Sequence, residues 1–397
     1  MKIESKTVHW GDRRKAGKFT PVTTPIYTAA SYTYESMEQL DRVFALEESG
    51  PAYARYDNPT RSALEELVRE LESGAGAIAC ASGMIAIHTA VLAALMDRPK
   101  RVLAANMMYG ATTSMLMNVF GPLGVETAQV DPCDLAAFEA ALTEAKTGAV
   151  VVETIANPLL RVPALDKIAA LCRDAGVPLI VDNTFATPLL VRPLELGANI
   201  VCHSATKYLA GHGDVLGGVI VADQAHFDAL RTLCRTIGPV MGPFESYLTM
   251  RGIKTLALRV ERQCANACKV AQWMAAHPRV ERTFFPGDPK HPDAATIARL
   301  FPPNRFGGLV SFELKGGGRT EVFRFMERLK MVVRATSLGD VHTLILYPAM
   351  ASHRDLSPKH RERLGIRDNL MRISVGIEAV EDIVADLEQA LDTSLKT

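Results

Sequence analysis

The feature that most constrains the fold is an alternation of short apolar runs with helical patterns, which extends from about residue 53 to residue 221. The apolar runs are rich in valine and isoleucine, and they read RVLAAN, GAVVVETI, VPLIVDNT, NIVCHS and GGVIVAD. Amphipathic stretches such as DKIAALCRDAG separate several of them. This pattern predicts an α/β fold with a mostly parallel sheet covered by helices. In such sheets ligands bind where loops leave the carboxyl ends of the strands, so we expect the functional residues there.

The pattern changes on both sides of this region. Residues 1–50 show weak periodicity, which predicts an extended arm, and residues 51–235 carry the α/β pattern. Residues 236–397 begin with long helical patterns and continue into a smaller α+β part, with strands near GGLVSFEL, MVVRAT, TLILY and LMRISVG. A chain of 397 residues has room for more than one domain. We therefore expect an arm, a large domain and a small C-terminal domain with these boundaries.

Composition excludes several classes of function. The 44 basic residues balance the 44 acidic ones without a long run of one charge, so neither a nucleic acid nor a membrane surface is an expected partner. No apolar run predicts a signal peptide or a membrane span, which favours a cytoplasmic protein. The seven scattered cysteines predict reduced thiols. Cys264 and Cys268 could share one helix face, but they lack further ligands nearby, so no metal site is expected.

A candidate anion site lies in the stretch CASGMIAIHTAVLAAL, where a strand is followed by Ser82, Gly83 and Met84 and then by a helix. Free N–H groups at a helix start attract anions, and a glycine allows close approach of the backbone. A plain helix cap by Ser82 is the alternative. The G-x-G-x-x-A spacing that begins at Gly74 has a helix before it and a strand after it, which is the reverse of a dinucleotide-binding fingerprint.

Two charged residues follow neighbouring apolar runs, Asp182 in VPLIVDNTF and Lys207 in NIVCHSATK. Each has an ordinary alternative, a turn-capping aspartate and a surface lysine. A lysine that is desolvated at the end of a core strand has a lowered pKa and can form a Schiff base. Ser204 and Thr206 add hydroxyl donors for a phosphate. Together these residues indicate the two ends of a pyridoxal 5'-phosphate (PLP) site, with a carboxylate for the ring nitrogen and an amine for the aldehyde.

Several motifs in order resemble the PLP-dependent enzymes of cysteine and methionine metabolism. They read YARYDNPTRSALEELVRELESG, ASGMIAI, ETIANPLL, VDNTFATPLL, SATKYLAGHGDVLGG and MRISVGIE. The family contains cystathionine γ-synthases, cystathionine β- and γ-lyases, methionine γ-lyases and O-acylhomoserine sulfhydrylases. The resemblance runs from about residue 5 to residue 390, and it implies the fold type I of aspartate aminotransferase and a homotetramer made of two catalytic dimers.

The resemblance also assigns roles to individual residues. It implies that Lys207 is the Schiff-base lysine and that Asp182 pairs with the pyridine nitrogen. Phosphate ligands are implied at Gly83, Met84, Ser204 and Thr206, with Tyr53 and Arg55 reaching the cofactor of the neighbouring subunit. The remaining implied residues are Tyr109, which stacks on the ring and moves a proton to the departing sulfur, Asn157, which faces the cofactor and the substrate, and Ser337 and Arg372, which hold the substrate carboxylate.

The expected reaction is the α,γ-elimination of a sulfur amino acid by a PLP-dependent carbon–sulfur lyase. The alternatives are a γ-replacement enzyme of the cystathionine γ-synthase or O-acylhomoserine sulfhydrylase kind, and a cystathionine β-lyase. The stretch SLGDVHTLILYPAMASH departs from the common family wording, with His342 for a glutamate and Tyr347 for a histidine. Asp340 after Gly339 resembles the S-L-G-D of methionine γ-lyases and some sulfhydrylases, whereas Ala111 stands where dedicated methionine γ-lyases carry a cysteine. The physiological substrate and the roles of His342, Tyr347 and His212 stay open.

Overall fold

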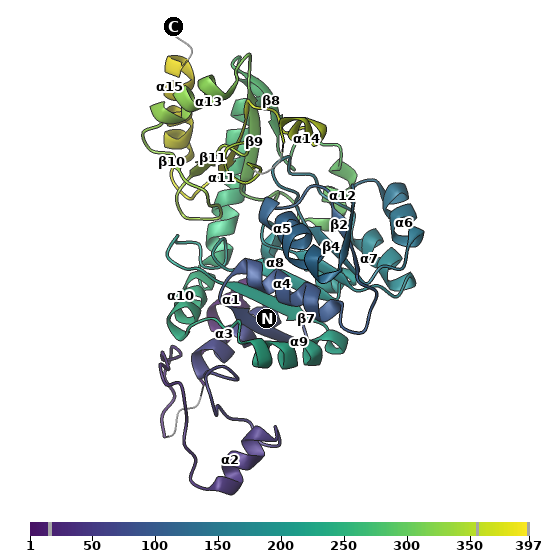
Figure 1. The fold of residues 1–397 in the computed structure, drawn as a ribbon. Coiled ribbons are helices and arrows are strands. Elements are labelled where there is room, and N and C mark those ends of the chain that lie inside the picture. The colour runs from purple at the N-terminus through teal and green to yellow at the C-terminus, as the bar shows by residue number, and fades with distance from the viewer. Residues whose placement is uncertain (15–17, 355–356, 395–397) are drawn as a thin grey trace.

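The structure, a computed structural model, describes residues 1–14, 18–354 and 357–394 and contains two β-sheets (Figure 1). The larger, seven-stranded sheet has the order β1-β7-β6-β5-β4-β2-β3. Its strands are β1 (Gly76–Cys80), β2 (Arg101–Ala105), β3 (Glu126–Val130), β4 (Ala149–Glu153), β5 (Leu179–Asp182), β6 (Ile200–Ser204) and β7 (Gly218–Ala222). Only β7 runs antiparallel to its neighbours, so the expected mostly parallel sheet is confirmed.

The burial of each strand follows the polarity of its side chains. All residues of β1, β2, β4 and β7 are buried, as expected for apolar runs that helices cover. The edge strand β3 begins with Glu126 and Thr127 and is partly exposed along most of its length. The strands with the longest valine and isoleucine runs therefore occupy the middle of the sheet.

Helices surround the larger sheet (Figure 1). They are α3 (Pro59–Glu72), α4 (Gly83–Ala94), α5 (Gly110–Met115), α6 (Leu135–Glu144), α7 (Leu165–Asp174), α8 (Thr187–Leu190) and α9 (Gln224–Ile237), with the short π- or 3-10-helical turns η1 (Leu116–Phe120), η2 (Gly121–Leu123) and η3 (Pro193–Leu196). The start of α3 is set by Asn58, whose side chain accepts from the N–H groups of Thr60 and Arg61, and by Pro59 in the first turn.

The second sheet has five strands in the order β10-β11-β12-β9-β8 and is antiparallel except between β10 and β11. Its strands are β8 (Val280–Phe284), β9 (Leu309–Leu314), β10 (Val333–Arg334), β11 (Leu344–Leu346) and β12 (Leu370–Ser374). The helices of this half of the chain are α10 (Pro243–Ile253), α11 (Leu256–Ala276), α12 (Ala294–Leu300), α13 (Arg319–Arg328), α14 (Pro358–Arg363) and α15 (Val380–Ser394).

The long helix α11 connects the two apolar cores. Leu256 and Val260, near its start, belong to the core of the larger sheet, whereas Val270 and Met274, near its end, belong to the core of the second sheet. No helix in the described ranges is both long and apolar enough to cross a membrane.

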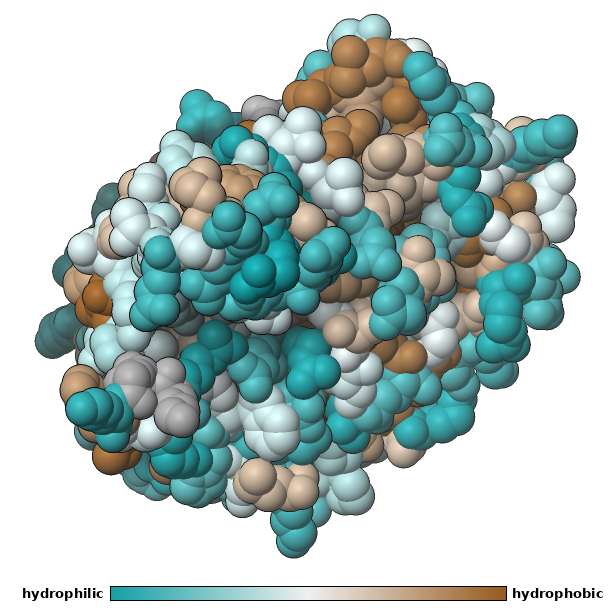
Figure 2. Space-filling view, turned by 90° about the horizontal axis from the view of Figure 1, so that it is seen from below, coloured by the Kyte–Doolittle hydropathy of each residue, from teal (hydrophilic) through white to brown (hydrophobic). Residues whose placement is uncertain are grey.

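The first fifty residues are more structured than the expected extended arm, because they contain α1 (Ile3–His9) and α2 (Met37–Phe44). The helix α2 projects away from the rest of the molecule (Figure 1). It buries only Val43, while Phe44 and Leu46 are exposed. Seen from below relative to Figure 1, the surface shows apolar side chains among polar ones (Figure 2). The arm therefore covers little of its own apolar surface within the single chain.

Candidate active site

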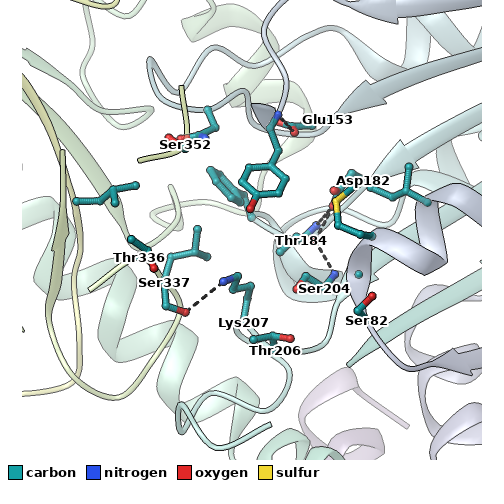
Figure 3. A pocket seen from close by; sticks show the side chains of 18 of the residues that line it. Ser82, Glu153, Asp182, Thr184, Ser204, Thr206, Lys207, Thr336, Ser337 and Ser352 are labelled. Atoms are coloured by element: carbon teal, nitrogen blue, oxygen red, sulfur yellow. Dashed lines mark hydrogen bonds between the residues drawn. The ribbon is translucent and has the colours of Figure 1, made fainter. Parts of the chain in front are cut away.

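A cavity of about 420 Å³ opens where β4, β5 and β6 end, beside the start of α4 and the segment before β11 (Figure 3). It brings together most of the residues that the sequence predicts, namely Gly83, Met84, Tyr109, Asn157, Asp182, Ser204, Thr206, Lys207, Ser337 and Arg372. Asp182 and Ser204 belong to the larger sheet and Arg372 to the second sheet, whereas the others lie at the start of α4 and in turns and loops. The cavity thus lies at the carboxyl ends of parallel strands, where open α/β sheets bind ligands.

Lys207 follows β6 and points into this cavity. Its Nζ donates to Ser337 Oγ at 3.2 Å, as Figure 3 shows. Its backbone is held in a turn, because its N–H donates to the Ser204 carbonyl at 3.2 Å and its carbonyl accepts from Gly211 at 2.8 Å. Burial, together with the nearby Arg372 cation, lowers the pKa of Lys207. This environment favours the neutral amine, which is the form that acts as nucleophile or base.

Asp182 is the last residue of β5, and two bonds from Thr184 fix its side chain. The N–H and the hydroxyl of Thr184 both donate to Oδ1, at 2.9 and 2.5 Å (Figure 3). Burial raises the pKa of Asp182, while the bonds from Thr184 and the charge of His203 act in the opposite direction. Both bonds end on Oδ1, and Oδ2 has no hydrogen-bond partner among the described residues. That oxygen can accept from a cationic N–H group.

The start of α4 packs directly against the end of β6. A Cβ atom at Gly83 would lie 2.8 Å from Ser204 Cβ and 2.9 Å from Ser204 Cα, so only glycine fits. Ser82 caps the helix by accepting from Ile85 N–H at 3.2 Å, which confirms the cap as well as the helix start. The earlier N–H groups, at residues 83 and 84, have no acceptor within the helix. The predicted phosphate ligands Ser204 and Thr206 line the same part of the cavity.

Arg372, in β12, is buried beside the cavity. Its Nη1 donates to Asn157 Oδ1 at 2.6 Å, and Nη2 lies 3.5 Å from the Ser337 carbonyl. Its Nε is buried and unpaired, and no carboxylate lies within ion-pair distance in the described parts of the chain. Burial lowers the pKa of Arg372 to about 10. A buried guanidinium with only neutral acceptors is suited to bind a carboxylate.

The loop that carries Asn157 is tied to the second half of the chain. Arg161 forms a two-pronged ion pair with Asp293, at 2.6 and 2.8 Å, and the N–H of Val162 donates to the same carboxylate at 2.9 Å. In addition, Ser311 Oγ donates to the carbonyl of Pro158 at 2.6 Å. These contacts hold Asn157 in place beside Arg372.

Tyr109 stands at the mouth of the cavity and is 44% exposed. It directly precedes α5, and its backbone N–H donates to Glu153 Oε1 at 2.7 Å. Gly110 follows in close contact with the second half of the chain, since a Cβ atom there would lie 2.2 Å from the carbonyl oxygen of Ser352. The tyrosine is therefore anchored through its backbone, while its side chain stays accessible.

Tyr53 and Arg55 do not line the cavity of their own chain. Tyr53 is 43% exposed, and Arg55 donates to the carbonyl of Arg235 and stacks on Tyr56, with 4.5 Å between its Cζ and the ring centroid. The prediction that they reach the cofactor of a neighbouring subunit stays a prediction.

Some cavity residues were not singled out from the sequence. They are Ile87, Ile155, Thr184, Phe185, Leu216, Thr336, Leu346, Ala351 and Ser352. Thr184 could have been found from its place two residues after Asp182, a spacing typical of a side-chain-stabilised turn. His342, by contrast, pairs with Asp340 at 2.9 Å outside the cavity, and Tyr347 is buried with its hydroxyl on the Asp368 carbonyl. His212 contacts the carbonyl of Ala210 in a turn.

The arrangement fits PLP. The free Oδ2 of Asp182 suits a protonated ring nitrogen, and the Lys207 amine suits an aldehyde. The glycine-lined start of α4, with Ser204 and Thr206 beside it, suits a phosphate group.

Comparison with known proteins places this geometry in context. The family model described as Cys/Met metabolism PLP-dependent enzyme matches residues 4–392. The chain is 43% identical to the L-methionine gamma-lyase of Pseudomonas putida over 375 residues, which cover 93% of this chain and 92% of that protein. Its fold matches the cystathionine gamma-lyase of Lactobacillus plantarum in complex with L-serine, with a TM-score of 0.92, 37% identity and 99% of both chains covered.

A third similar protein bears on the cofactor. A structure from Campylobacter jejuni, described as an O-acetylhomoserine (thiol)-lyase, contains a pyridoxyl-lysine monophosphate residue. It matches with a TM-score of 0.91 and 28% identity, and the match covers 99% of this chain and 100% of that chain. In that relative, the cofactor is thus joined to a lysine side chain.

Proposed function

Because the chain belongs to the family of Cys/Met metabolism PLP-dependent enzymes, we propose that it cleaves the bond between Cγ and sulfur of a sulfur amino acid by α,γ-elimination. The reaction consumes one water molecule, and its products are a thiol, ammonia and a 2-oxo acid. Methionine and cystathionine are the substrates to test first, because similar proteins include a methionine γ-lyase and a cystathionine γ-lyase. One observation carries the proposal: the Lys207 amine and the Arg372 guanidinium, which has no anionic partner among the described residues, line the same cavity.

PLP is the cofactor, and when bound it supplies a conjugated ring that takes up the electrons released when a bond at Cα breaks. Lys207 would hold its aldehyde end, Asp182 its ring nitrogen, and Gly83, Met84, Ser204 and Thr206 its phosphate. Tyr109 would lie against the ring, and Asn157 would face both cofactor and substrate. Tyr53 and Arg55 would hold the phosphate bound to a neighbouring subunit.

The protein side chains then bind the substrate and move its protons. Arg372 and Ser337 bind the α-carboxylate, so that Cα lies near the Lys207 amine. Lys207 Nζ takes the proton from Cα, and its lowered pKa increases the fraction of neutral amine available for this. Once Nζ has released that proton again inside the cavity, the same amine can take the second proton, at Cβ, which γ-elimination requires. Tyr109 Oη donates a proton to the departing sulfur.

We further propose that the enzyme is a cytoplasmic homotetramer of two catalytic dimers. The exposed apolar residues around α2 support an interface in this region. The exposure of Tyr53, away from its own cavity, supports a role in a neighbouring site. Within each chain we assign residues 1–50 to the arm, residues 51–235 to the PLP-binding domain and residues 236–397 to the small domain.

A substrate panel with product identification tests the reaction. Release of 2-oxobutanoate from methionine or cystathionine is the expected result, and Lys207→Ala should abolish it. If the enzyme instead joins a thiol to an O-acylhomoserine without net release of 2-oxobutanoate, it is a replacement enzyme and the elimination proposal is wrong. Release of pyruvate from cystathionine would show β-elimination.

A further inference from the structure

Glu153 is a buried acid in the cavity that has no part in the chemistry described so far. It ends β4, is 8% exposed and lines the cavity near Asp182 (Figure 3). Its Oε1 accepts from the backbone N–H of Tyr109 at 2.7 Å. Its Oε2 is buried and has no hydrogen-bond partner in the described ranges. A carboxylate oxygen left unpaired in such a place is costly, so its protonation state needs an explanation.

The neighbouring charges favour a proton on Glu153. Glu153 and Asp182 are paired in register on the adjacent parallel strands β4 and β5, so two carboxyl groups share one end of the sheet. Two adjacent carboxyl groups rarely ionise together at neutral pH. Asp182 receives two hydrogen bonds from Thr184, which stabilise its ionised form. Glu153 receives no hydroxyl donor comparable to that of Thr184, since its Oε1 accepts from the Tyr109 N–H, so it is the weaker acid of the two.

The other groups around Glu153 do not reverse this order. Burial, followed by the charge of Asp182, raises the pKa of Glu153 to about 8. The backbone N–H groups of Tyr109 and Asn157 and the Arg372 cation on β12 act in the opposite direction. At neutral pH Glu153 is therefore mostly protonated, even with a cation in the same cavity.

A neutral acid accounts for both oxygens. Its carbonyl oxygen can accept from the Tyr109 N–H, and its hydroxyl is a donor that lacks an acceptor within the described chain. We propose that Glu153 works as a neutral carboxylic acid that positions Tyr109 through Oε1 and keeps a proton on the buried Oε2, so that Asp182 is the ionised member of the carboxyl pair at this end of the sheet.

This inference rests on the proposed function in one respect, which is that the reaction takes place in this cavity. Ionisation of Glu153 would add a second negative charge beside Asp182. Turnover by the wild-type enzyme is therefore expected to fall as the pH rises through about 8.

Three variants separate this role from a purely structural one. Glu153→Gln keeps a carbonyl acceptor and an N–H donor but cannot ionise, whereas Glu153→Ala loses both. Glu65→Gln is the matched control, because Glu65 also accepts a backbone N–H, from Ala79 at 2.9 Å, and burial raises its pKa to about 7. Glu65 lies on α3, outside the reaction cavity.

Two measurements on the holoenzyme test the proposal. The first is infrared difference spectroscopy of the protonated carboxyl C=O band between pH 6 and pH 10. A band that is present in wild type and in Glu65→Gln, absent in Glu153→Gln, and lost through about pH 8 is expected. The second is the pH profile of turnover. Glu153→Gln should keep turnover within threefold of wild type at pH 7 and extend it to higher pH, whereas Glu153→Ala should fall at least tenfold.

Two results would overturn the proposal. One is an infrared spectrum in which Glu153→Gln removes no protonated carboxyl band, since Glu153 would then be ionised. The other is a folded Glu153→Gln variant as inactive as Glu153→Ala. If the wild-type enzyme turned over no sulfur amino acid, the proposed function would fail, but the infrared band would still decide the protonation state of Glu153. That measurement also holds if Glu153→Ala does not fold.

Discussion

Replacing Arg372 by leucine should remove substrate binding with little loss of stability. The guanidinium is buried, and its contacts are neutral acceptors, Asn157 Oδ1 at 2.6 Å and the Ser337 carbonyl at 3.5 Å. Replacing a buried charge by an apolar side chain relieves its desolvation cost. The variant leaves Asn157 Oδ1 unpaired, which costs about 1–3 kcal/mol. The two effects oppose each other, so the free energy of unfolding should change little.

The effect on activity should be much larger. A guanidinium binds a carboxylate through two charge-assisted hydrogen bonds, each worth about 1.5–3 kcal/mol. Loss of about 3–6 kcal/mol lowers kcat/KM roughly 10²- to 10⁴-fold, since about 1.4 kcal/mol corresponds to a factor of ten. Arg372→Lys keeps a point charge and one bond, so a loss of about ten- to a hundredfold is expected, mainly in KM.

The assay is steady-state release of 2-oxo acid from methionine and cystathionine, combined with thermal unfolding of each variant. Arg372→Leu should reduce kcat/KM more than Arg372→Lys does, while both variants should unfold near the wild-type temperature. If Arg372→Lys stayed within threefold of wild type in kcat/KM, Arg372 would not bind the substrate carboxylate. A Tm lowered as sharply as the activity would instead indicate a structural role.

Three further predictions follow from particular contacts. Gly83→Ala introduces a Cβ atom 2.8 Å from Ser204 Cβ, and it should weaken PLP binding about five- to a hundredfold in an absorbance titration. Gly121→Ala is the control, because the atom nearest to its new Cβ lies 3.9 Å away, and it should leave PLP binding unchanged. Asp293→Asn breaks the ion pair with Arg161 and should lower the Tm and raise the KM, and an unchanged KM would show that this contact does not position the substrate loop. The pKa of Glu153 is higher in the folded state than in the unfolded state. The free energy of unfolding should therefore fall as the pH rises from about 4.5 to about 8, where the unfolded chain releases the proton more readily than the folded chain does. The Tm advantage of Glu153→Gln over wild type should grow across that interval, and a constant difference would contradict this reasoning.

Much of the fold and the chemistry could be predicted because both depend on local pattern. Buried apolar runs have a clear signal in the sequence; Asp182 ends one of them, and Lys207 follows another by three residues. The helix cap at Ser82 is also local, since its acceptor bond spans three residues. The position of these side chains at one end of a parallel sheet then follows from the topology.

What could not be predicted depends on contacts between distant segments. The bond from Tyr109 to Glu153 spans 44 residues, and the bond from Arg372 to Asn157 spans 215. No periodicity indicates such pairs. The helix α2 has a local cap at Ser36 and an amphipathic pattern, but in the single chain it buries only Val43. His342 and Tyr347 differ from the family wording, yet their contacts place them outside the cavity.

The most direct test of the central claim is the identity of the lysine that holds the cofactor. The holoenzyme is treated with borohydride, digested and analysed by mass spectrometry, with Lys207→Ala as the control. A pyridoxyl-phosphate adduct on Lys207, together with loss of both adduct and activity in the variant, is the predicted result. An adduct on another lysine, or full lyase activity in Lys207→Ala, would contradict the account.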